Sequence, residues 1–281
     1  MQPMRGDGIP DPADPAAPAR DRCVPLIEAL PMTSTTQTSA TQPPVASGLL
    51  GGRIALVTGA SRGIGRAVAL AFAREGAELI VVGRTQGALE ELDDALRAEG
   101  RQASLVAGDL ADGTLVDRIG AAIFARWGRL DVLVGNAATL GVLGPLGHTD
   151  PAVFERVIAV NLIANWRLLR SCDPLLRASD AGRAIFVTSD VAPGRAYWGA
   201  YAASKAGLEA MIRTYAGEMA KTDVRANLID PGPTRTRLRA TAFPGEDSEA
   251  LKPADDPRLI EAFIALALPS CRRNGEIVQI D

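Results

Sequence analysis

The sequence predicts an α/β fold in which a single doubly wound domain has a seven-stranded parallel sheet flanked by helices. From Ile54 to the C-terminus, short runs of apolar and β-branched residues alternate with segments of helical periodicity. The first run leads through closely spaced glycines into a helix, an order typical of βαβ units. The chain has 281 residues, 47% of them hydrophobic, which is enough to bury one large core.

Residues 1–48 differ in composition from the rest. They hold about half of the 19 prolines and include a Thr/Ser/Gln-rich run at 33–42. Such a segment buries too little apolar surface to offset its conformational entropy, so we expect a disordered Pro/Ala/Thr-rich extension ahead of a domain at 49–281. Its apolar stretch is broken by proline and glutamate, unlike a signal peptide. Translation could begin at Met1 or at Met32.

The expected strands are short and rich in Val, Ile, Leu and Ala, as strands buried on both faces of a parallel sheet are. A strand of this kind ends at each point where glycine or a polar residue interrupts the apolar run. In chain order, the seven expected strands cover Ile54–Val57, Leu79–Val82, Ala103–Ala107, Asp131–Val134, Ala184–Thr188, Val224–Ile229 and Glu276–Ile280.

Segments with apolar residues at helical spacing separate these strands. Gly100 ends the second helix and Pro151 begins the fourth, positions that suit each residue. Pro174 is expected to kink or divide the fourth helix, because proline removes a backbone donor. The expected helices cover Arg66–Glu75, Gln86–Glu99, Thr114–Trp127, Pro151–Arg177, Tyr201–Ala220 and Leu259–Leu268. Residues 234–256 lack strand periodicity, and we expect them to form a lid over the substrate.

Composition excludes several classes of function. The net charge of −3 provides no basic surface for nucleic acid or an anionic membrane, and no apolar run is long enough to span one. The three cysteines are scattered and the chain has one histidine, so neither a disulfide framework nor a metal site is indicated. These features favour a cytoplasmic protein.

The glycine turn after the first strand indicates a dinucleotide site. Gly59 permits a tight turn, Gly63 allows backbone to approach a phosphate, and Gly65 allows the helix to pack on the strand. The following helix would offer free N–H groups and a partial positive charge to an anion. Glycine turns also join strands and helices without any ligand, so this motif alone leaves that alternative open.

A second motif, Tyr201-x-x-x-Lys205, indicates acid–base chemistry. The chain has only three lysines and three tyrosines, so a chance occurrence of this spacing has a probability of roughly 3%. Four residues apart on a helix, the two side chains emerge on the same face. A core tyrosine beside a lysine with a buried stem is the structural alternative.

With these motifs in place, the chain resembles the short-chain dehydrogenase/reductase family over residues 50–281. The resemblance rests on Thr58-Gly-Ala-Ser-Arg-Gly-Ile-Gly65 together with Asp109-Leu110, Asn136-Ala137, Asn161, Ser189, Tyr201-x-x-x-Lys205 and Pro231-Gly232. It implies a Rossmann-type domain and a homodimer or homotetramer. It also implies hydride transfer between a nicotinamide cofactor and a small carbonyl or alcohol substrate. A non-catalytic NAD(P)-binding sensor on the same fold is the alternative.

The resemblance and the glycine turn together indicate the site residues. The expected catalytic residues are Asn161, Ser189, Tyr201 and Lys205. The expected cofactor-binding residues are Gly59, Ser61, Arg62, Gly63, Ile64, Gly65, Arg84, Asp109, Leu110, Asn136, Ala137, Tyr201, Lys205, Pro231, Gly232, Thr234 and Thr236. No metal is expected.

The implied mechanism moves a proton through Tyr201. We expect the Lys205 ammonium and the positive nicotinamide ring to lower the pKa of the phenol toward the working range. Ser189 would hydrogen-bond the substrate oxygen, and Asn161 would hold a water that links Lys205 to solvent. Tyr197 and Trp198 are expected to line the substrate pocket.

The end of the second strand indicates a preference for NADP(H) over NAD(H). Enzymes of this fold that prefer NAD usually carry an acidic residue there, which accepts hydrogen bonds from the ribose hydroxyls. The corresponding residue here is Gly83, so no carboxylate repels a 2′-phosphate. Arg84 follows at once as a partner, and Arg62 in the glycine turn could approach the same phosphate. Both arginines could instead be simply exposed.

Overall fold

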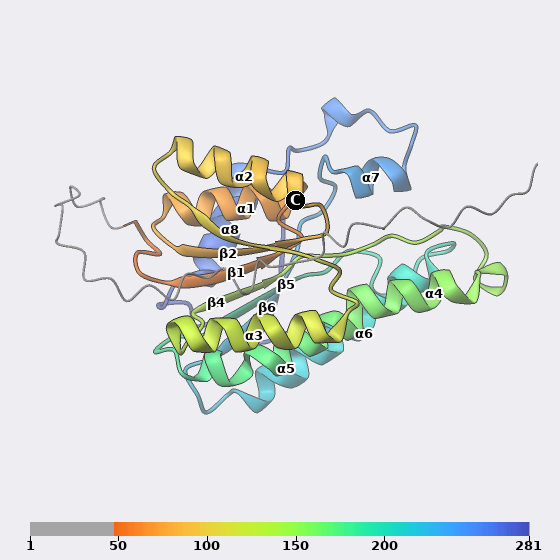
Figure 1. Cartoon of the computed structure of the whole chain (residues 1–281). Helices are drawn as coiled ribbons and strands as arrows, with labels where there is room; N and C mark the ends of the chain where they lie inside the picture. The colour runs from red at the N-terminus through yellow and green to blue at the C-terminus, as the bar shows by residue number, and fades with distance from the viewer. Residues whose placement is uncertain (1–47, 281) are drawn as a thin grey trace, which may run out of the picture.

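The computed structural model describes residues 48–280, so residues 1–47 of the expected extension lie outside the described part. Its seven parallel strands form one sheet in the order β3-β2-β1-β4-β5-β6-β7 (Figure 1). This confirms the predicted fold class. Each strand begins and ends within one residue of its predicted bounds, at Ile54–Thr58, Glu78–Gly83, Ala103–Ala107, Val132–Gly135, Arg183–Val187, Arg225–Asp230 and Ile277–Gln279 for β1 to β7.

Helices cover both faces of the sheet (Figure 1). Buried residues of α1, α2 and α8 form a core on one face, and buried residues of α3, α5 and α6 form a core on the other. This explains the nearly continuous apolar composition of the strands, since each contributes side chains to both cores. The helices are α1 (Gly63–Arg74), α2 (Gln86–Ala98), α3 (Gly113–Trp127), α4 (Pro151–Ile158), α5 (Ala164–Arg177), α6 (Gly199–Glu218), α7 (Arg237–Ala242) and α8 (Pro257–Ala267).

The strand order reverses direction at β1. The chain runs from β1 outward to β2 and β3, then returns to β4 on the other side, so that Val57 pairs with Val81 in β2 and with Val134 in β4. Ligands of doubly wound sheets bind at such a switch point, outside the carboxyl ends of the strands. The loops after β1 and β4 therefore meet at one edge, where the glycine turn lies.

The long helix predicted at residues 151–177 is interrupted, but not where the sequence indicated. Between α4 and α5, the segment Ala159–Ile163 forms one stretch of π-helix that includes Asn161. The prediction that Pro174 divides the helix is wrong, because α5 continues through Pro174 to Arg177. Pro174 lies in the last turn of α5, where only one intrahelical bond is lost and few residues follow.

Residues 234–256, the lid segment, contain the short helix α7 and a 3-10 turn at Ser248–Ala250. The two ends of the segment meet: Thr234 forms a parallel bridge with Lys252, and the Arg235 N–H donates to the Lys252 carbonyl at 2.8 Å. On its inner side, α7 and Phe243 pack against Trp198 and Tyr201. The segment is thus held at its base and along one face.

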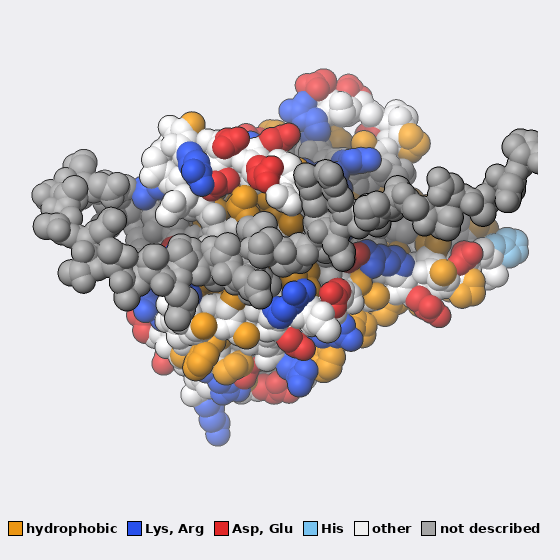
Figure 2. Space-filling view, viewed as in Figure 1, with side chains coloured by type: hydrophobic (Ala, Val, Ile, Leu, Met, Phe, Trp, Pro, Cys, Tyr) orange, Lys and Arg blue, Asp and Glu red, His pale blue; other side chains and the backbone are white. Residues whose placement is uncertain are grey.

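The surface carries interspersed charges on the face seen in Figure 2, where basic and acidic side chains alternate over the helices. Among residues 48–280, no helix combines the length and apolar character needed to cross a membrane. Within the same range, no group of three or more His, Cys, Asp or Glu side chains is arranged to hold a metal ion.

Arg183 joins the start of β5 to the chain that follows α8. Its side chain is 2% exposed, and burial lowers its pKa to about 10. Its guanidinium donates to the carbonyls of Gly182, Asp223, Leu268, Pro269 and Cys271. Replacing Arg183 by methionine leaves these carbonyls without their donor, so we expect the free energy of unfolding to fall by about 3 kcal/mol.

Chemical denaturation of Arg183→Met and of a surface control would test this. Arg177 also pairs through its guanidinium, with Asp173 at 3.0 Å, but lies on the exposed side of α5. Arg177→Met should therefore change the free energy of unfolding by less than about 1 kcal/mol. Equal effects of the two variants would contradict the structural role of Arg183.

Candidate active site

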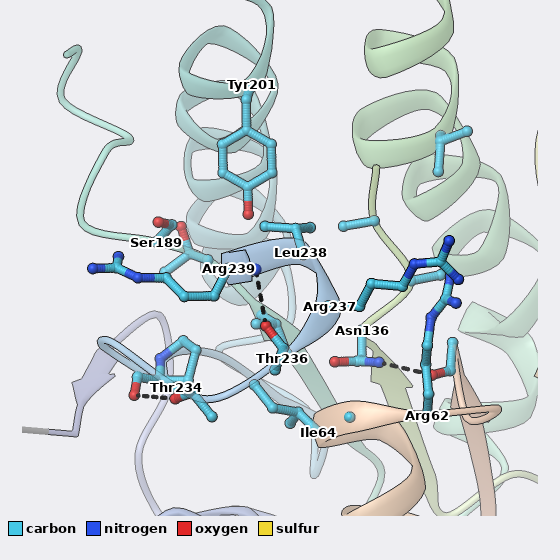
Figure 3. Close-up of a pocket in the computed structure, with 18 of the residues that line it drawn as sticks. Arg62, Ile64, Asn136, Ser189, Tyr201, Thr234, Thr236, Arg237, Leu238 and Arg239 are labelled. Atoms are coloured by element: carbon cyan, nitrogen blue, oxygen red, sulfur yellow. Dashed lines mark hydrogen bonds between the residues drawn. The ribbon is translucent and has the colours of Figure 1, made fainter. Parts of the chain in front are cut away.

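A pocket lies along the carboxyl ends of the strands and beneath the lid segment (Figure 3). Most of the predicted site residues line it: Gly59, Ser61, Arg62, Gly63, Ile64, Arg84, Asp109, Leu110, Asn136, Ala137, Ser189, Tyr201, Lys205, Pro231, Gly232, Thr234 and Thr236. Two predicted residues do not. Gly65 lies in the first turn of α1, and Asn161 lies in the π-helical segment, where it bonds Ser204 of α6.

The glycine turn needs its glycines for two physical reasons. Gly59 and Gly63 have φ values of +66° and +54°, which residues with a side chain rarely adopt. Gly65 has an ordinary φ but no space: a Cβ there would lie 2.4 Å from the Gly59 carbonyl oxygen and 2.4 Å from Asn136 Nδ2. The absence of side chains lets α1 pack directly on the turn.

The start of α1 fits a phosphate group. Arg62 occupies the N-cap position without a side-chain capping bond, so the first-turn N–H groups have no cap from that side chain. These groups and the helix dipole favour an anion. A Cβ on Gly63 would meet only Thr236 Cγ2, at 3.5 Å, so the backbone there is open toward the pocket. The residues present therefore suit the pyrophosphate of a dinucleotide.

The loop after β4 is tied to the turn after β1. The Thr58 hydroxyl donates to the Val134 carbonyl at 3.1 Å and accepts from the N–H groups of Asn136 and Ala137 at 3.0 and 3.2 Å. The Asn136 amide donates back to the Thr58 carbonyl at 3.0 Å. These bonds hold the floor of the pocket rigid between the two strands.

Tyr201 and Lys205 lie together in the pocket on one face of α6. Both are buried, and Lys205 Nζ lies 5.6 Å from the centre of the Tyr201 ring. The ammonium donates to the Val187 carbonyl at the end of β5, at 2.7 Å. Burial lowers the pKa of Lys205 to about 8, although the carboxylates of Asp230 and Glu209 oppose this change.

The expected lowering of the Tyr201 pKa does not occur in the chain itself. Burial raises the pKa of the phenol, and the negative charges of Asp230 and Asp190 raise it further. Desolvation and two carboxylates disfavour the phenolate. In the protein alone, Tyr201 is therefore a neutral phenol at physiological pH.

The two carboxylates beside the predicted site were missed by motif reasoning. Asp190 follows Ser189 after β5, and its Oδ1 accepts a hydrogen bond from the Ser189 hydroxyl at 3.0 Å. Asp230 ends β6 and accepts from the Gly232 N–H at 3.0 Å. Their positions next to predicted site residues at carboxyl strand ends could have indicated them.

The Asn161 side chain hydrogen-bonds two other parts of the chain. Its side-chain oxygen accepts from the Thr139 N–H at 2.8 Å, while its amide nitrogen donates to the Thr139 carbonyl at 2.9 Å and the Ser204 hydroxyl at 3.0 Å. The π-helical segment thus connects the loop after β4 with α6, the helix that carries Tyr201 and Lys205.

A cluster of aromatic side chains lies beside Tyr201. Trp198 packs edge-on against the Tyr201 ring with centroids 5.9 Å apart, and Phe243 of the lid segment lies 5.6 Å from Trp198. Trp198 lines the pocket as predicted, but the prediction for Tyr197 is wrong. Tyr197 is 65% exposed, adopts a φ of +71° and is not among the residues that line the pocket.

The ends of β2 and β3 border the pocket as well. Arg84 is exposed and lines the pocket beside Gly83, where β2 ends. Asp109 also lines it and is paired with Arg156 of α4. Its pKa is lowered by hydrogen bonds from Ala111 and Arg156 and by the charges of Arg156 and Arg84, which outweigh the effect of burial.

The chain is similar to known oxidoreductases over much of its length. The family described as short chain dehydrogenase matches residues 53–247. The uncharacterized oxidoreductase YciK of Escherichia coli K12 is 43% identical over 212 residues, which cover 74% of this chain and 84% of that protein. An uncharacterized NAD-dependent oxidoreductase of Mycobacterium tuberculosis is 37% identical over 202 residues, covering 66% of this chain and 72% of that protein.

Solved structures show the same fold. One, described as a putative short chain dehydrogenase from E. coli CFT073 complexed with NADPH, has 39% identity and a TM-score of 0.79, covering 83% of this chain and 98% of that one. E. coli YciK itself has 38% identity and a TM-score of 0.78 over 86% of this chain and 99% of that one. This chain therefore belongs to the short-chain dehydrogenase/reductase family and is an NAD(P)-dependent oxidoreductase.

Proposed function

We propose that the protein is an NADP(H)-dependent enzyme that interconverts a carbonyl and an alcohol on a small molecule, with Tyr201 as the acid and base. The observation that carries this proposal is the buried pair Tyr201 and Lys205, which lines the same pocket as Ser189 and the glycine turn. A protein that only sensed the cofactor would need the turn but not these three side chains together.

Each residue has a distinct part in the reaction. The bound nicotinamide cofactor supplies or accepts hydride. Tyr201, neutral in the protein alone, donates its phenolic proton to the substrate oxygen in reduction and takes it back in oxidation. Ser189 hydrogen-bonds that oxygen and stabilises its developing charge. The Lys205 ammonium favours the tyrosinate left after proton transfer.

Other residues hold the two ligands in place. Asn161 acts as a positioning residue, because its bonds to Thr139 and Ser204 fix α6 against the loop after β4. The lid segment covers the substrate, and Trp198, supported by Phe243 packed against it, supplies an apolar surface for it. The remaining predicted residues at the carboxyl ends of the strands bind the cofactor.

A panel of ketones and alcohols, each incubated with both cofactors, would test the activity. Absorbance at the reduced-nicotinamide band should change with at least one pair and show a preference for NADP(H). No turnover across a broad panel, together with tight cofactor binding, would favour a sensor instead.

The preference for NADP(H) rests on the end of β2. Gly83 places no carboxylate where an NAD-binding protein of this fold usually has one. Arg84 and Arg62 line the pocket and are both exposed there, available to a 2′-phosphate. One charge-assisted hydrogen bond contributes about 1.5–3 kcal/mol, so we expect at least a tenfold preference.

Binding measurements on Arg84→Gln and on Gly83→Asp/Arg84→Gln would test this preference. The first variant should lose affinity for NADP by about tenfold and keep its affinity for NAD. The second should prefer NAD. A Cβ at residue 83 would lie 3.1 Å from Leu89 Cδ2 and 3.2 Å from Ser61 Cβ, so Gly83→Ala is the control for crowding alone. Tighter binding of NAD than NADP by the unmodified protein would refute the proposal.

A further inference from the structure

The lid segment carries three arginines, and their surroundings differ. Arg235 is not among the residues that line the pocket, and it pairs with Glu249 at 2.7 Å. Arg239 pairs with Glu246 through two hydrogen bonds of 2.6 Å and stacks on Phe243. Arg237 lines the pocket and has no carboxylate partner among residues 48–280.

Arg62, on the glycine turn, resembles Arg237 in its surroundings. It extends from the glycine turn, lines the pocket, and has no carboxylate partner within the described residues 48–280. Figure 3 shows Arg62 and Arg237 reaching from different elements toward the same part of the pocket. The two elements are neighbours at their bases, because a Cβ built on Gly63 would lie 3.5 Å from Thr236 Cγ2.

The position of Arg237 is set by the fold of the lid segment. Thr236 caps α7 by accepting from the Arg239 N–H at 3.2 Å, and Arg237 is the first residue of that helix. The segment is held at its base by the bridge between Thr234 and Lys252. Packing of Leu238 against the cluster around Trp198 and Tyr201 holds its inner face. Arg237 is therefore presented to the glycine turn by a supported backbone.

Two guanidinium groups directed at one region repel each other unless an anion lies between them. Each is permanently charged, and a planar guanidinium suits the geometry of phosphate oxygens. We propose that Arg237 and Arg62 hold one phosphate group of the bound dinucleotide between them, so that the cofactor links the lid segment to the glycine turn. The inference rests on the proposed cofactor site and adds Arg237 as a binding residue of the lid.

Cofactor affinity without substrate is the direct test, measured by calorimetry on Arg237→Gln and Arg235→Gln. Both variants remove one positive charge from the same lid segment, but Arg235 pairs with Glu249 outside the pocket. Arg237→Gln should weaken binding by about tenfold or more, and Arg235→Gln by less than about twofold. Equal affinities of the two variants would overturn the proposal.

Two further measurements identify the phosphate group and test whether Arg237 and Arg62 hold it together. Loss of affinity for both NAD and NADP assigns Arg237 to the pyrophosphate, whereas loss for NADP alone assigns it to the 2′-phosphate. In a double-mutant cycle with Arg62→Gln, the two losses should not add, because both side chains hold one group. Additive losses of affinity would show that Arg237 and Arg62 do not hold the same phosphate group. If the unmodified protein bound neither cofactor, the proposed function itself would fail.

Discussion

Replacing Tyr201 by phenylalanine should lower turnover by about 10²- to 10⁴-fold, the usual contribution of a positioned acid or base. The variant loses only the hydroxyl, so the ring should keep its edge-on contact with Trp198. Cofactor affinity should stay close to that of the unmodified protein. Steady-state rates on an identified substrate, together with the dissociation constant of NADP, would separate the two effects.

Tyr197 provides a matched control for this substitution. It lies four residues earlier, is 65% exposed, and does not line the pocket. Tyr197→Phe removes the same atom and should leave turnover unchanged. Near-normal turnover in Tyr201→Phe with tight cofactor binding would show that another group transfers the proton.

Lys205→Met should reduce turnover by orders of magnitude without destabilising the protein. Substitution removes the ammonium that favours the tyrosinate. It also removes a buried charge, because Lys205 is 2% exposed. Lys221 is an exposed lysine that does not line the pocket, and Lys221→Met should have normal turnover. Turnover within tenfold of normal in Lys205→Met would contradict the assigned role.

The stability of the cofactor-free protein should reveal the lowered pKa of Lys205. The Lys205 pKa of about 8 lies below the ordinary lysine pKa of 10.5, so between these pH values the unfolded chain binds more protons than the folded one. The free energy of unfolding of the unmodified protein, relative to Lys205→Met, should therefore rise by about 2–3 kcal/mol as the pH increases from about 8 to 10. A difference that stays constant with pH would show that Lys205 has an ordinary pKa.

Local signals in the sequence were enough to predict the order and bounds of the seven strands. A buried strand ends where glycine or a polar residue interrupts its apolar run. The position of such a strand end depends little on distant contacts. The glycine turn was predictable for the same reason, since Gly59 and Gly63 adopt positive φ values. The Tyr201 and Lys205 pair follows from helical spacing alone.

The break in the long helix was not predictable from local rules. Proline is the usual breaker, yet α5 passes through Pro174 and the interruption falls at Ala159–Ile163. That segment allows Asn161 to bond Thr139 and Ser204, which lie on two other elements. The π-helical turn is therefore stabilised by hydrogen bonds to distant parts of the chain, which a local sequence rule does not include.

The sequence by itself therefore determined the fold class, the element order, the glycine turn and the residues at the carboxyl ends of the strands. The tertiary structure decided which charged side chains form ion pairs and in which direction the pKa values of buried groups shift. Arg237 and Arg239 both line the pocket and lie only two residues apart, but Arg239 pairs with Glu246 and Arg237 has no carboxylate partner among residues 48–280. The pKa of Tyr201 is raised because burial and the carboxylates of Asp230 and Asp190 act through space. Desolvation and charge proximity depend on the whole packed chain, which no local pattern records.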